Sequence, residues 1–290
     1  MKYKGRYFGV PTHVGSMTFY YRTDIFEKEG YKVPTTWEEV LEIAKDVEAK
    51  YGPDMHGFVF MGRADIQGIA TFMNILGGYG GDFYDPETFK PTMNSPEAMK
   101  ALQMEMELLK YSVPESPSYG FDEAHTAFQQ GRAAMLPFWD SGDGFFSDPE
   151  QSDIIGKWGV APMPGARATN GGWTVQISAD SKNPEAAWEF LKWIVSPEIE
   201  RKLVPLKPAA RISILTDPAN KQYPSYQGFY NVLSGNPFGF PKILPNWQML
   251  EIAAQGINKV ITGQSTPEEG LKWIQTQYEV ILLRYDLWKP

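Results

Sequence analysis

The segment Asp-Ser-Gly-Asp-Gly at residues 140–144 holds the two closely spaced carboxylates that come nearest to a reactive pair. A retaining glycoside hydrolase needs two carboxyl groups about 5 Å apart across the scissile bond, usually from different strand ends. Aspartates within one glycine-rich turn more often cap helices and form turns. A calcium loop would need an oxygen ligand at its third position, where Gly142 stands. The segment therefore favours a turn, and a carbohydrate hydrolase that uses Asp140 with a second carboxylate is kept as the alternative.

Other signatures of catalysis are missing from the sequence. It has no cysteine and three histidines, His13, His56 and His125, none of which is paired at a metal-binding helical spacing. No G-x-S-x-G elbow, Walker loop or dinucleotide fingerprint occurs. We therefore expect no cofactor, no metal site and no catalytic residue.

Aromatic side chains are the most distinctive part of the composition, at 14% of 290 residues. Trp139 ends an apolar strand pattern, Trp173 follows two glycines and precedes another strand, and Trp247 lies between a proline-rich loop and a helix. An indole at such a place offers a flat apolar face beside polar groups, which suits the C–H face of a pyranose. Each of the three, taken singly, fits a core role at least as well. The other tryptophans lie within helical or strand patterns and are assigned to packing: Trp37, Trp158, Trp188, Trp193, Trp273 and Trp288.

The charge balance argues against a nucleic-acid partner. The chain has 35 acidic and 27 basic side chains and a net charge of −8, whereas a protein that grips the phosphate backbone needs a basic stripe. Hydrophobic residues make up 42% of the chain, and no apolar run approaches the roughly 18 residues of a membrane span. No secretory signal is visible at the amino terminus, which leaves a protein that stays inside the cell or a sequence without its natural beginning.

The elements that position these residues alternate between helices and short strands. Helix starts repeat one pattern, in which a Ser, Thr or Asn cap precedes proline or an acidic residue near the positive end of the helix dipole. Caps are expected at residues 36, 95, 183, 196 and 266, and a further helix over residues 122–130, ended by Gly131. Strands are expected over residues 7–11, 17–21, 57–61, 133–138, 158–161 and 174–178. Short strands separated by helices indicate an α/β protein.

The last quarter of the chain has a different character. Residues 223–245 are crowded with Pro, Gly, Asn and Tyr, and we expect a long surface connection there. A helical block follows from Trp247 to about Arg284.

Four stretches carry a resemblance to a known family. The first is Gly-Arg-Tyr-Phe-Gly-Val-Pro at 5–11 with Phe-Tyr-Tyr-Arg-Thr-Asp-Ile-Phe at 19–26, where Arg22 replaces the usual Asn. The others are Thr-Trp-Glu-Glu at 36–39, Phe-Gln-Gln-Gly-Arg-Ala-Ala-Met at 128–135, and Gly-Gly-Trp at 171–173 with Ala-Ala-Trp-Glu-Phe-Leu at 186–191. Together, in order and spacing over nearly the whole chain, they resemble the extracellular solute-binding proteins of carbohydrate ABC importers, the class that includes maltodextrin-binding proteins.

The resemblance implies a periplasmic-binding-protein-like (type II) α/β fold of two lobes with a ligand cleft between them. In the family the stretch matched at residue 5 lies roughly one hundred residues into the mature protein. We therefore expect a complete C-terminal lobe (15–173 and 213–290) and a partial N-terminal lobe with hinge strands (1–14 and 174–212). Hinges are expected near residues 14–16, 171–174 and 211–213. A truncated chain, a split gene whose other half is a separate chain, or a degenerate gene would each explain the missing part.

Eight positions match stretches where the family contacts its ligand. His13 and Gly15 lie on the first crossing strand, and Trp173 takes the place of a hinge-strand contact. Arg63 and Arg211 could each form bidentate hydrogen bonds to vicinal hydroxyls or to a carboxylate, so a sugar acid is also considered. The implied ligand-binding residues are His13, Gly15, Arg63, Trp139, Asp140, Trp173, Arg211 and Trp247.

The function implied by the resemblance is that of a non-catalytic receptor. It would bind a mono- or oligosaccharide by aromatic stacking and hydrogen bonds, close its lobes around it, and deliver it to ABC transporter permease subunits. A separate chain that supplies the missing N-terminal lobe is a further expected partner, and the implied location is periplasmic or extracellular, at the membrane through the permease. A ligand-sensing domain for a membrane kinase is the other alternative. Because one lobe is incomplete, we expect sugar affinity much weaker than micromolar and an exposed apolar face that favours dimerisation or aggregation.

Overall fold

In the computed structural model, which describes residues 2–3, 5–205, 207–223, 226 and 237–289, one long strand forms the centre of the molecule. This strand, β3 (Val10–Arg22), is rich in β-branched and aromatic residues, which favour extended backbone. The sequence predicted two strands here, over 7–11 and 17–21. The structure joins them, because residues 13–16 pair continuously with residues 170–173 of a neighbouring strand.

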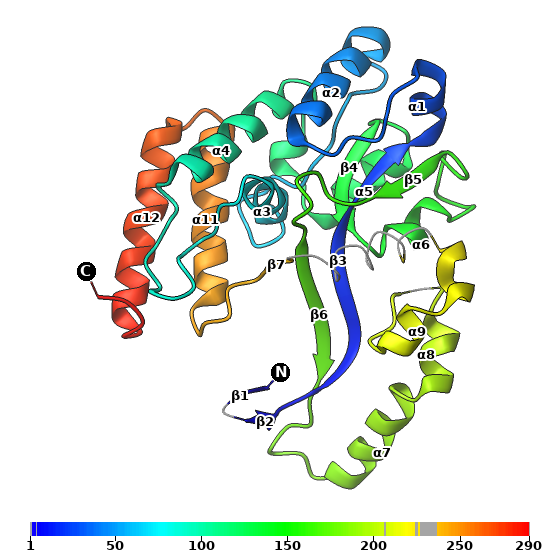
Figure 1. Ribbon diagram of the computed structural model, residues 1–290, viewed down its shortest axis with the longest axis vertical. Helices are drawn as coiled ribbons and strands as arrows, with labels where there is room; N and C mark the ends of the chain where they lie inside the picture. The colour runs from blue at the N-terminus through cyan, green and yellow to red at the C-terminus, as the bar shows by residue number, and fades with distance from the viewer. Residues whose placement is uncertain (1, 4, 206, 224–225, 227–236, 290) are drawn as a thin grey trace.

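The sheet built on β3 is mostly antiparallel. β4 and β5 pair with the second half of β3, β6 pairs with its first half, and β7 adds to β6 in parallel. β3 and β6 run side by side from the helical half of the molecule to the end that holds the small β1–β2 sheet (Figure 1). The remaining strands are β1 (Lys2–Tyr3), β2 (Arg6–Tyr7), β4 (Met135–Trp139), β5 (Trp158–Ala161), β6 (Thr169–Val175) and β7 (Phe238–Gly239).

Helices cover the sheet in two groups. α3, α4, α11 and α12 pack together on one side, whereas α7, α8 and α9 lie near the end where β3 begins and β6 ends (Figure 1). The helices are α1 (Thr23–Glu29), α2 (Trp37–Tyr51), α3 (Ile69–Gly78), α4 (Pro96–Leu109), α5 (Phe121–Gln129), α6 (Gly142–Phe146), α7 (Pro184–Ile194), α8 (Pro197–Leu203), α9 (Ile212–Leu215), α11 (Asn246–Ile261) and α12 (Pro267–Arg284). Among the residues described, no helix combines the length and apolar character that crossing a membrane would require.

The predicted helix caps are confirmed at four positions. In each, the side chain accepts a hydrogen bond from the backbone N–H three residues on, which satisfies a donor that the helix leaves unpaired. These caps are Thr36, Ser95, Ser196 and Thr266. The fifth, Asn183, makes no capping hydrogen bond through its side chain. Gly131, the predicted stop after α5, has a φ of 74°, a conformation that favours glycine.

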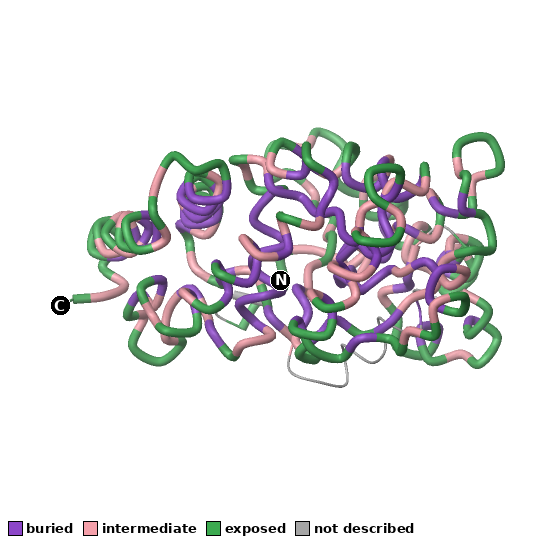
Figure 2. Tube along the Cα trace, turned by 90° about the horizontal axis from the view of Figure 1, so that it is seen from above, coloured by how far each residue is buried: buried purple, intermediate pink, exposed green. Residues whose placement is uncertain are grey.

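Two hydrophobic clusters of very different size hold the fold together. The main core fills the helical half, and its fully buried side chains include Phe19, Trp37, Phe72 and Tyr278. Seen from above, buried residues run through the centre of the molecule and along α11 (Figure 2). The second cluster lies against Val14 of β3 and consists of Val204, Ala209, Ile214, Leu215 and Tyr226. This cluster includes residues beyond 212, the position after which the sequence predicted that the chain returns to the C-terminal lobe.

Several segments differ from their predicted structure. Residues 57–61 do not form a strand, and only Phe58 among them makes an isolated bridge, to Ser112. A buried apolar run has no alternation that would distinguish a strand from a loop in the sequence. The strand predicted at 174–178 is β6, Thr169–Val175, which starts earlier because it follows the pairing with β3. Within 223–245, residues 224–225 and 227–236 lie outside the described residues, and the buried Phe238 belongs to β7. The assignment of Trp188 and Trp193 to packing is wrong, because both are about half exposed on α7.

Candidate functional site

One face of the β3–β6 pair brings together three of the predicted ligand contacts. His13 lies opposite Trp173 across the two strands, and Gly15 lies opposite Gly171. Alternate residues of a strand point to the same side, so these two cross-strand pairs share one face, here called the ligand face. Val14, between them, packs toward the second cluster on the other side.

At the two glycines, neighbouring side chains come close to the backbone of the ligand face. A methyl group added to Gly15 would lie 3.1 Å from Nε2 of His13 and 3.8 Å from Oδ1 of Asp140. A methyl group added to Gly171 would lie 3.1 Å from the Phe240 ring and 3.6 Å from the indole of Trp139. Polar groups therefore lie against Gly15, and aromatic rings lie against Gly171.

Asp140 lies at the edge of the ligand face and is only 3% exposed. Its Oδ2 accepts a 3.2 Å hydrogen bond from the backbone N–H of Ser16, and its Oδ1 lies 3.7 Å from Nε2 of His13. Burial raises the pKa of this carboxyl, and the neighbouring His13 acts in the opposite direction. Nδ1 of His13 is buried without a hydrogen-bond partner among the described residues. The pair is thus a mostly buried polar contact at the edge of the ligand face, in which the His13 side chain, 15% exposed, is the more accessible member.

Three rings form a row next to this carboxylate. The ring of Trp139, at the end of β4, lies 6.2 Å from that of Phe240, centroid to centroid, with 24° between the planes. The Phe240 ring lies 6.3 Å from that of Trp247, with 39° between the planes. Exposure increases outward, from the partly buried Trp139 to Trp247 at 57%. These residues, here called the ring row, offer adjacent flat surfaces to apolar C–H groups.

Trp173 completes the aromatic surroundings of the ligand face. Its side chain is 74% exposed, and its carbonyl oxygen accepts a 3.3 Å hydrogen bond from Oγ1 of Thr12. The three tryptophans singled out in the sequence are therefore not sealed in separate interiors. Trp139 and Trp247 are linked by Phe240, and Trp173 stands on the face that Trp139 borders.

Sequence reasoning missed two residues of this arrangement. Phe240 lies in the segment that was expected to be a surface connection, and the available signal was an aromatic residue set between Gly239 and Pro241. Gly171 was noted as part of a motif and of an expected hinge, but not as a residue of the site. Its position two residues before Trp173 could have marked it as a neighbour on the same face of the strand.

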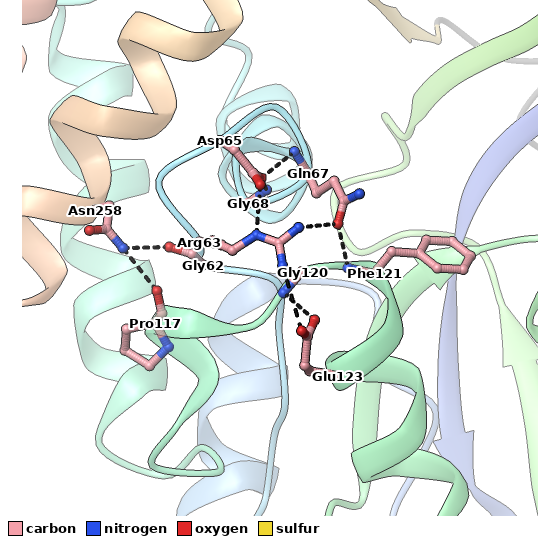
Figure 3. A network of polar contacts seen from close by, with 10 residues as sticks. All are labelled: Gly62, Arg63, Asp65, Gln67, Gly68, Pro117, Gly120, Phe121, Glu123 and Asn258. Atoms are coloured by element: carbon pink, nitrogen blue, oxygen red, sulfur yellow. Dashed lines mark hydrogen bonds and ion pairs between the residues drawn. The ribbon is translucent and has the colours of Figure 1, made fainter.

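Arg63, predicted to contact ligand, is held in a separate polar network (Figure 3). Its Nε donates to Oδ2 of Asp65 at 2.6 Å, and one terminal nitrogen donates to Oε1 of Gln67 at 2.7 Å. The other terminal nitrogen lies 3.5 Å from Glu123. Because Gln67 also accepts from the backbone N–H of Phe121, the network ties the start of α3 to the start of α5. These contacts engage all three nitrogens of the guanidinium group, and their partners are not residues of the ligand face.

Arg211 is likewise engaged by its own surroundings. It donates a 2.8 Å hydrogen bond to the carbonyl oxygen of Val195 at the end of α7, and its Nε lies 3.3 Å from Oε2 of Glu200. Glu200 is buried, which raises the pKa of its carboxyl, and Arg211 opposes that shift. Arg211 therefore joins α7 to α8. Ligand contact by either arginine stays a prediction.

The remaining chemistry of the described residues does not add a second site. They hold no group of three or more His, Asp and Glu side chains placed to bind a metal ion. Asp143, the second carboxylate of the 140–144 turn, accepts a 3.3 Å hydrogen bond from the Tyr20 hydroxyl. Cavities of about 330 Å³ beside α9 and about 300 Å³ between α11 and α12 are lined by none of the predicted ligand contacts.

A family model and several curated relatives match this chain, and they describe binding proteins. The family model for bacterial extracellular solute-binding proteins matches residues 1–201. A probable ABC transporter-binding protein of Deinococcus radiodurans is 28% identical over 290 residues, which cover 94% of this chain and 68% of the relative. The chain spans 64% to 68% of the length of the curated relatives that match it almost throughout.

Solved structures confirm the fold. The maltose-bound MalE3 of T. maritima is 29% identical with a TM-score of 0.89, and the match covers 97% of this chain and 74% of that one. An ABC transporter solute-binding protein of Agrobacterium radiobacter K84, in complex with ribitol, is 30% identical with a TM-score of 0.84, covering 97% and 73%. The predicted type II periplasmic-binding fold is thus confirmed.

The family also decides between the functional classes left open by the sequence. Its members bind solutes for ABC transporters and are not enzymes, which confirms the non-catalytic prediction and overturns the hydrolase alternative for Asp140. The family is extracellular by its description. The match over residues 1–201 extends across both strands of the ligand face. The chain belongs to the family of bacterial extracellular solute-binding proteins.

Proposed function

We propose that this protein binds a mono- or oligosaccharide on the ligand face and the ring row and presents it to the permease subunits of an ABC importer. The observation that carries the proposal is that polar groups lie against Gly15 and aromatic rings lie against Gly171 on one face of the β3–β6 pair. A sugar ring has both surfaces. Its C–H faces suit indole and phenyl rings, and its hydroxyl groups suit a carboxylate and an imidazole.

The proposal includes two lobes that close around the sugar. Residues 15–173 and 213–290 would form the complete lobe, and residues 1–14 and 174–212 the partial one. The separate hydrophobic clusters support two lobes, and the second cluster, which includes Ile214, Leu215 and Tyr226, favours a boundary later than residue 213. A ligand held by groups on both sides would favour the closed arrangement. The place of action would be outside the cytoplasmic membrane, next to the permease, and a separate chain could supply the rest of the first lobe.

Indole NMR tests the proposal directly, even for weak binding. The chain has 9 tryptophans, so each indole N–H can be assigned by substitution. Titration with maltose and with ribitol should shift the signals of Trp139, Trp173 and Trp247. The Trp188 signal should stay in place, since that residue is exposed on α7, away from the ring row. Shifts at Trp188 alone, or none with any sugar of a broad panel, would refute the proposal.

Substitution sharpens the same experiment. Trp247→Ala should weaken binding about tenfold, because removing one stacked ring costs roughly 1–1.5 kcal/mol beyond its buried area. Trp188→Ala is the matched control and should leave binding unchanged. Calorimetry should show affinity weaker than micromolar for this chain alone. Micromolar or tighter binding would contradict the expectation of an incomplete cleft while leaving the binding function intact.

A further inference from the structure

The bulge in β3 lies next to two predicted ligand contacts. A register shift between Pro11 and His13 leaves Thr12 without a partner across β6. A bulge bends its strand and redirects the neighbouring side chains. The backbone at Thr12 therefore sets the direction of His13 and, across the ladder, of Trp173. Oγ1 of Thr12 donates to the Trp173 carbonyl oxygen at 3.3 Å, which ties the bulge to β6.

Lys207 holds the bulge from the other side. Its ammonium group donates a hydrogen bond to the carbonyl oxygen of Thr12, 195 positions away in the sequence. The side chain is partly buried, and burial lowers its pKa, while the carboxylate of Glu200 acts in the opposite direction. A buried ammonium group has lost part of its hydration, so its bond to a carbonyl oxygen replaces water.

The backbone of Lys207 is itself anchored. Its N–H donates to the carbonyl oxygen of Leu203 at 3.1 Å, and its own carbonyl oxygen accepts from the Tyr226 hydroxyl at 3.3 Å. Tyr226 belongs to the second cluster, and its hydroxyl also accepts a 2.8 Å hydrogen bond from the backbone N–H of Ala209. The side chain of Lys207 therefore extends from a backbone position held by the second cluster to strand β3.

We propose that Lys207 is a positioning residue of the ligand face: it fixes the Thr12 bulge and thereby holds His13 and Trp173 in place. The inference rests on the proposed function for the meaning of that face. Lys207 acts through the backbone of β3 and does not itself touch the ligand. It also makes the second cluster a support of the site, because the cluster residue Tyr226 anchors the lysine.

Imidazole NMR on the full chain tests this role without any ligand. Lys207→Met keeps the apolar stem and removes the donor. We expect the imidazole signals of His13 and the indole signal of Trp173 to shift. His56, paired with Glu48, and His125, stacked on Phe145, should stay in place and serve as internal references.

Three further variants complete the design. Lys207→Arg should restore the His13 signals, since a guanidinium group also donates to a carbonyl oxygen. Thr12→Val removes the other bond of the bulge and should move the same two residues. Lys202→Met, on the exposed side of α8, is the matched control and should move neither. Unchanged His13 signals in both bulge variants, or equal shifts at all three histidines, would overturn the positioning role.

A maltose titration of the same variants links the role to binding. Lys207→Met should weaken binding on the order of tenfold, the size of one hydrogen bond to a charged group, and Lys207→Arg should recover most of it. Full affinity in Lys207→Met would overturn the inference. If no variant and not even the parent chain binds a sugar, the proposed function fails, and the imidazole shifts still decide the positioning role.

Discussion

Helices α12 and α7 have similar N-termini, but α12 is enclosed by other helices and α7 is largely exposed. Each starts with proline after a capping position, and each has an apolar stripe. α12 packs against α11 and α4 and buries six residues along its length: Gly270, Leu271, Ile274, Tyr278, Ile281 and Leu282. α7 fully buries only Leu191 and leaves Trp188, Phe190 and Trp193 about half exposed.

This difference shows which of the two apolar stripes is covered. A helix normally buries its apolar stripe against other elements. The main core encloses α12, but the described part of the chain does not enclose α7. The expected exposed apolar face is therefore present, and it lies at the end of the molecule that carries the second cluster. Dimerisation or aggregation through it stays a prediction.

Truncating one aromatic residue in each of these helices should give the largest difference in the free energy of unfolding. Tyr278→Ala removes a fully buried ring whose hydroxyl donates to the Met249 carbonyl oxygen at 2.7 Å, and should lower the free energy of unfolding by about 3–5 kcal/mol. Trp193→Ala should change it by less than about 0.5 kcal/mol, because half of that indole is already in water. Urea unfolding followed by circular dichroism measures both. Equal losses would mean that α7 is enclosed in solution.

The main core should also give the stability a pH dependence. Glu105 in α4 is buried with neither carboxyl oxygen hydrogen-bonded among the described residues, and burial raises its pKa from 4.5 to about 8. Between these values the folded protein keeps the proton that the unfolded chain releases. The stability that Glu105 contributes is therefore fully present below about pH 4.5 and is lost as pH rises toward 8, by at most about 1.4 kcal/mol per pH unit.

Unfolding midpoints at several pH values between these limits test this. Glu105→Gln should flatten the slope, whereas Glu97→Gln, exposed in the first turn of the same helix, should keep it. A slope that survives in Glu105→Gln would assign the dependence to other groups. α7 has no fully buried carboxyl of its own, so its variants should leave the slope unchanged.

The smallest expected effect concerns association through α7. Replacing Trp188 and Trp193 together by Gln should weaken self-association about tenfold, which is about 1.4 kcal/mol. The apolar area removed from contact would be lost from both partners. Sedimentation velocity over a range of concentrations measures it. Leu283→Gln, exposed on α12, is the control and should have no effect. A parent chain that stays monomeric throughout would contradict the expected association.

Features that depend on neighbouring residues in the sequence were predictable, whereas contacts between distant segments were not. The caps at Thr36 and Thr266 follow from hydroxyl groups three residues before a glutamate, and β5 has the predicted bounds of residues 158–161. The continuity of β3 could not be read locally, because Gly15 and Ser16 become strand only through pairing with β6. The exposure of Trp188 was missed for the same reason: an amphipathic pattern does not say whether a partner is present.

The site shows the same limit. The residue types of Trp139, Asp140 and Trp247 indicated sugar chemistry, but only the fold could add Phe240 between the two tryptophans. Arg63 and Arg211 illustrate the converse. A guanidinium group can in principle bond to a sugar. In this structure the guanidinium group of Arg63 pairs with Asp65, and that of Arg211 pairs with Glu200.

The ladder between β3 and β6 has a consequence for synthesis of the protein. Its paired residues are separated by 154 positions (Ser16 and Asn170) to 165 positions (Val10 and Val175). At about 5–20 residues per second, a ribosome needs on the order of ten seconds or more to make the intervening chain. During that time the first half of β3 has an open edge, the kind that other strands can join. The β3–β6 ladder can thus form only after β4 and β5 are available to pair with β3, and the first half of β3 is open to mispairing before then.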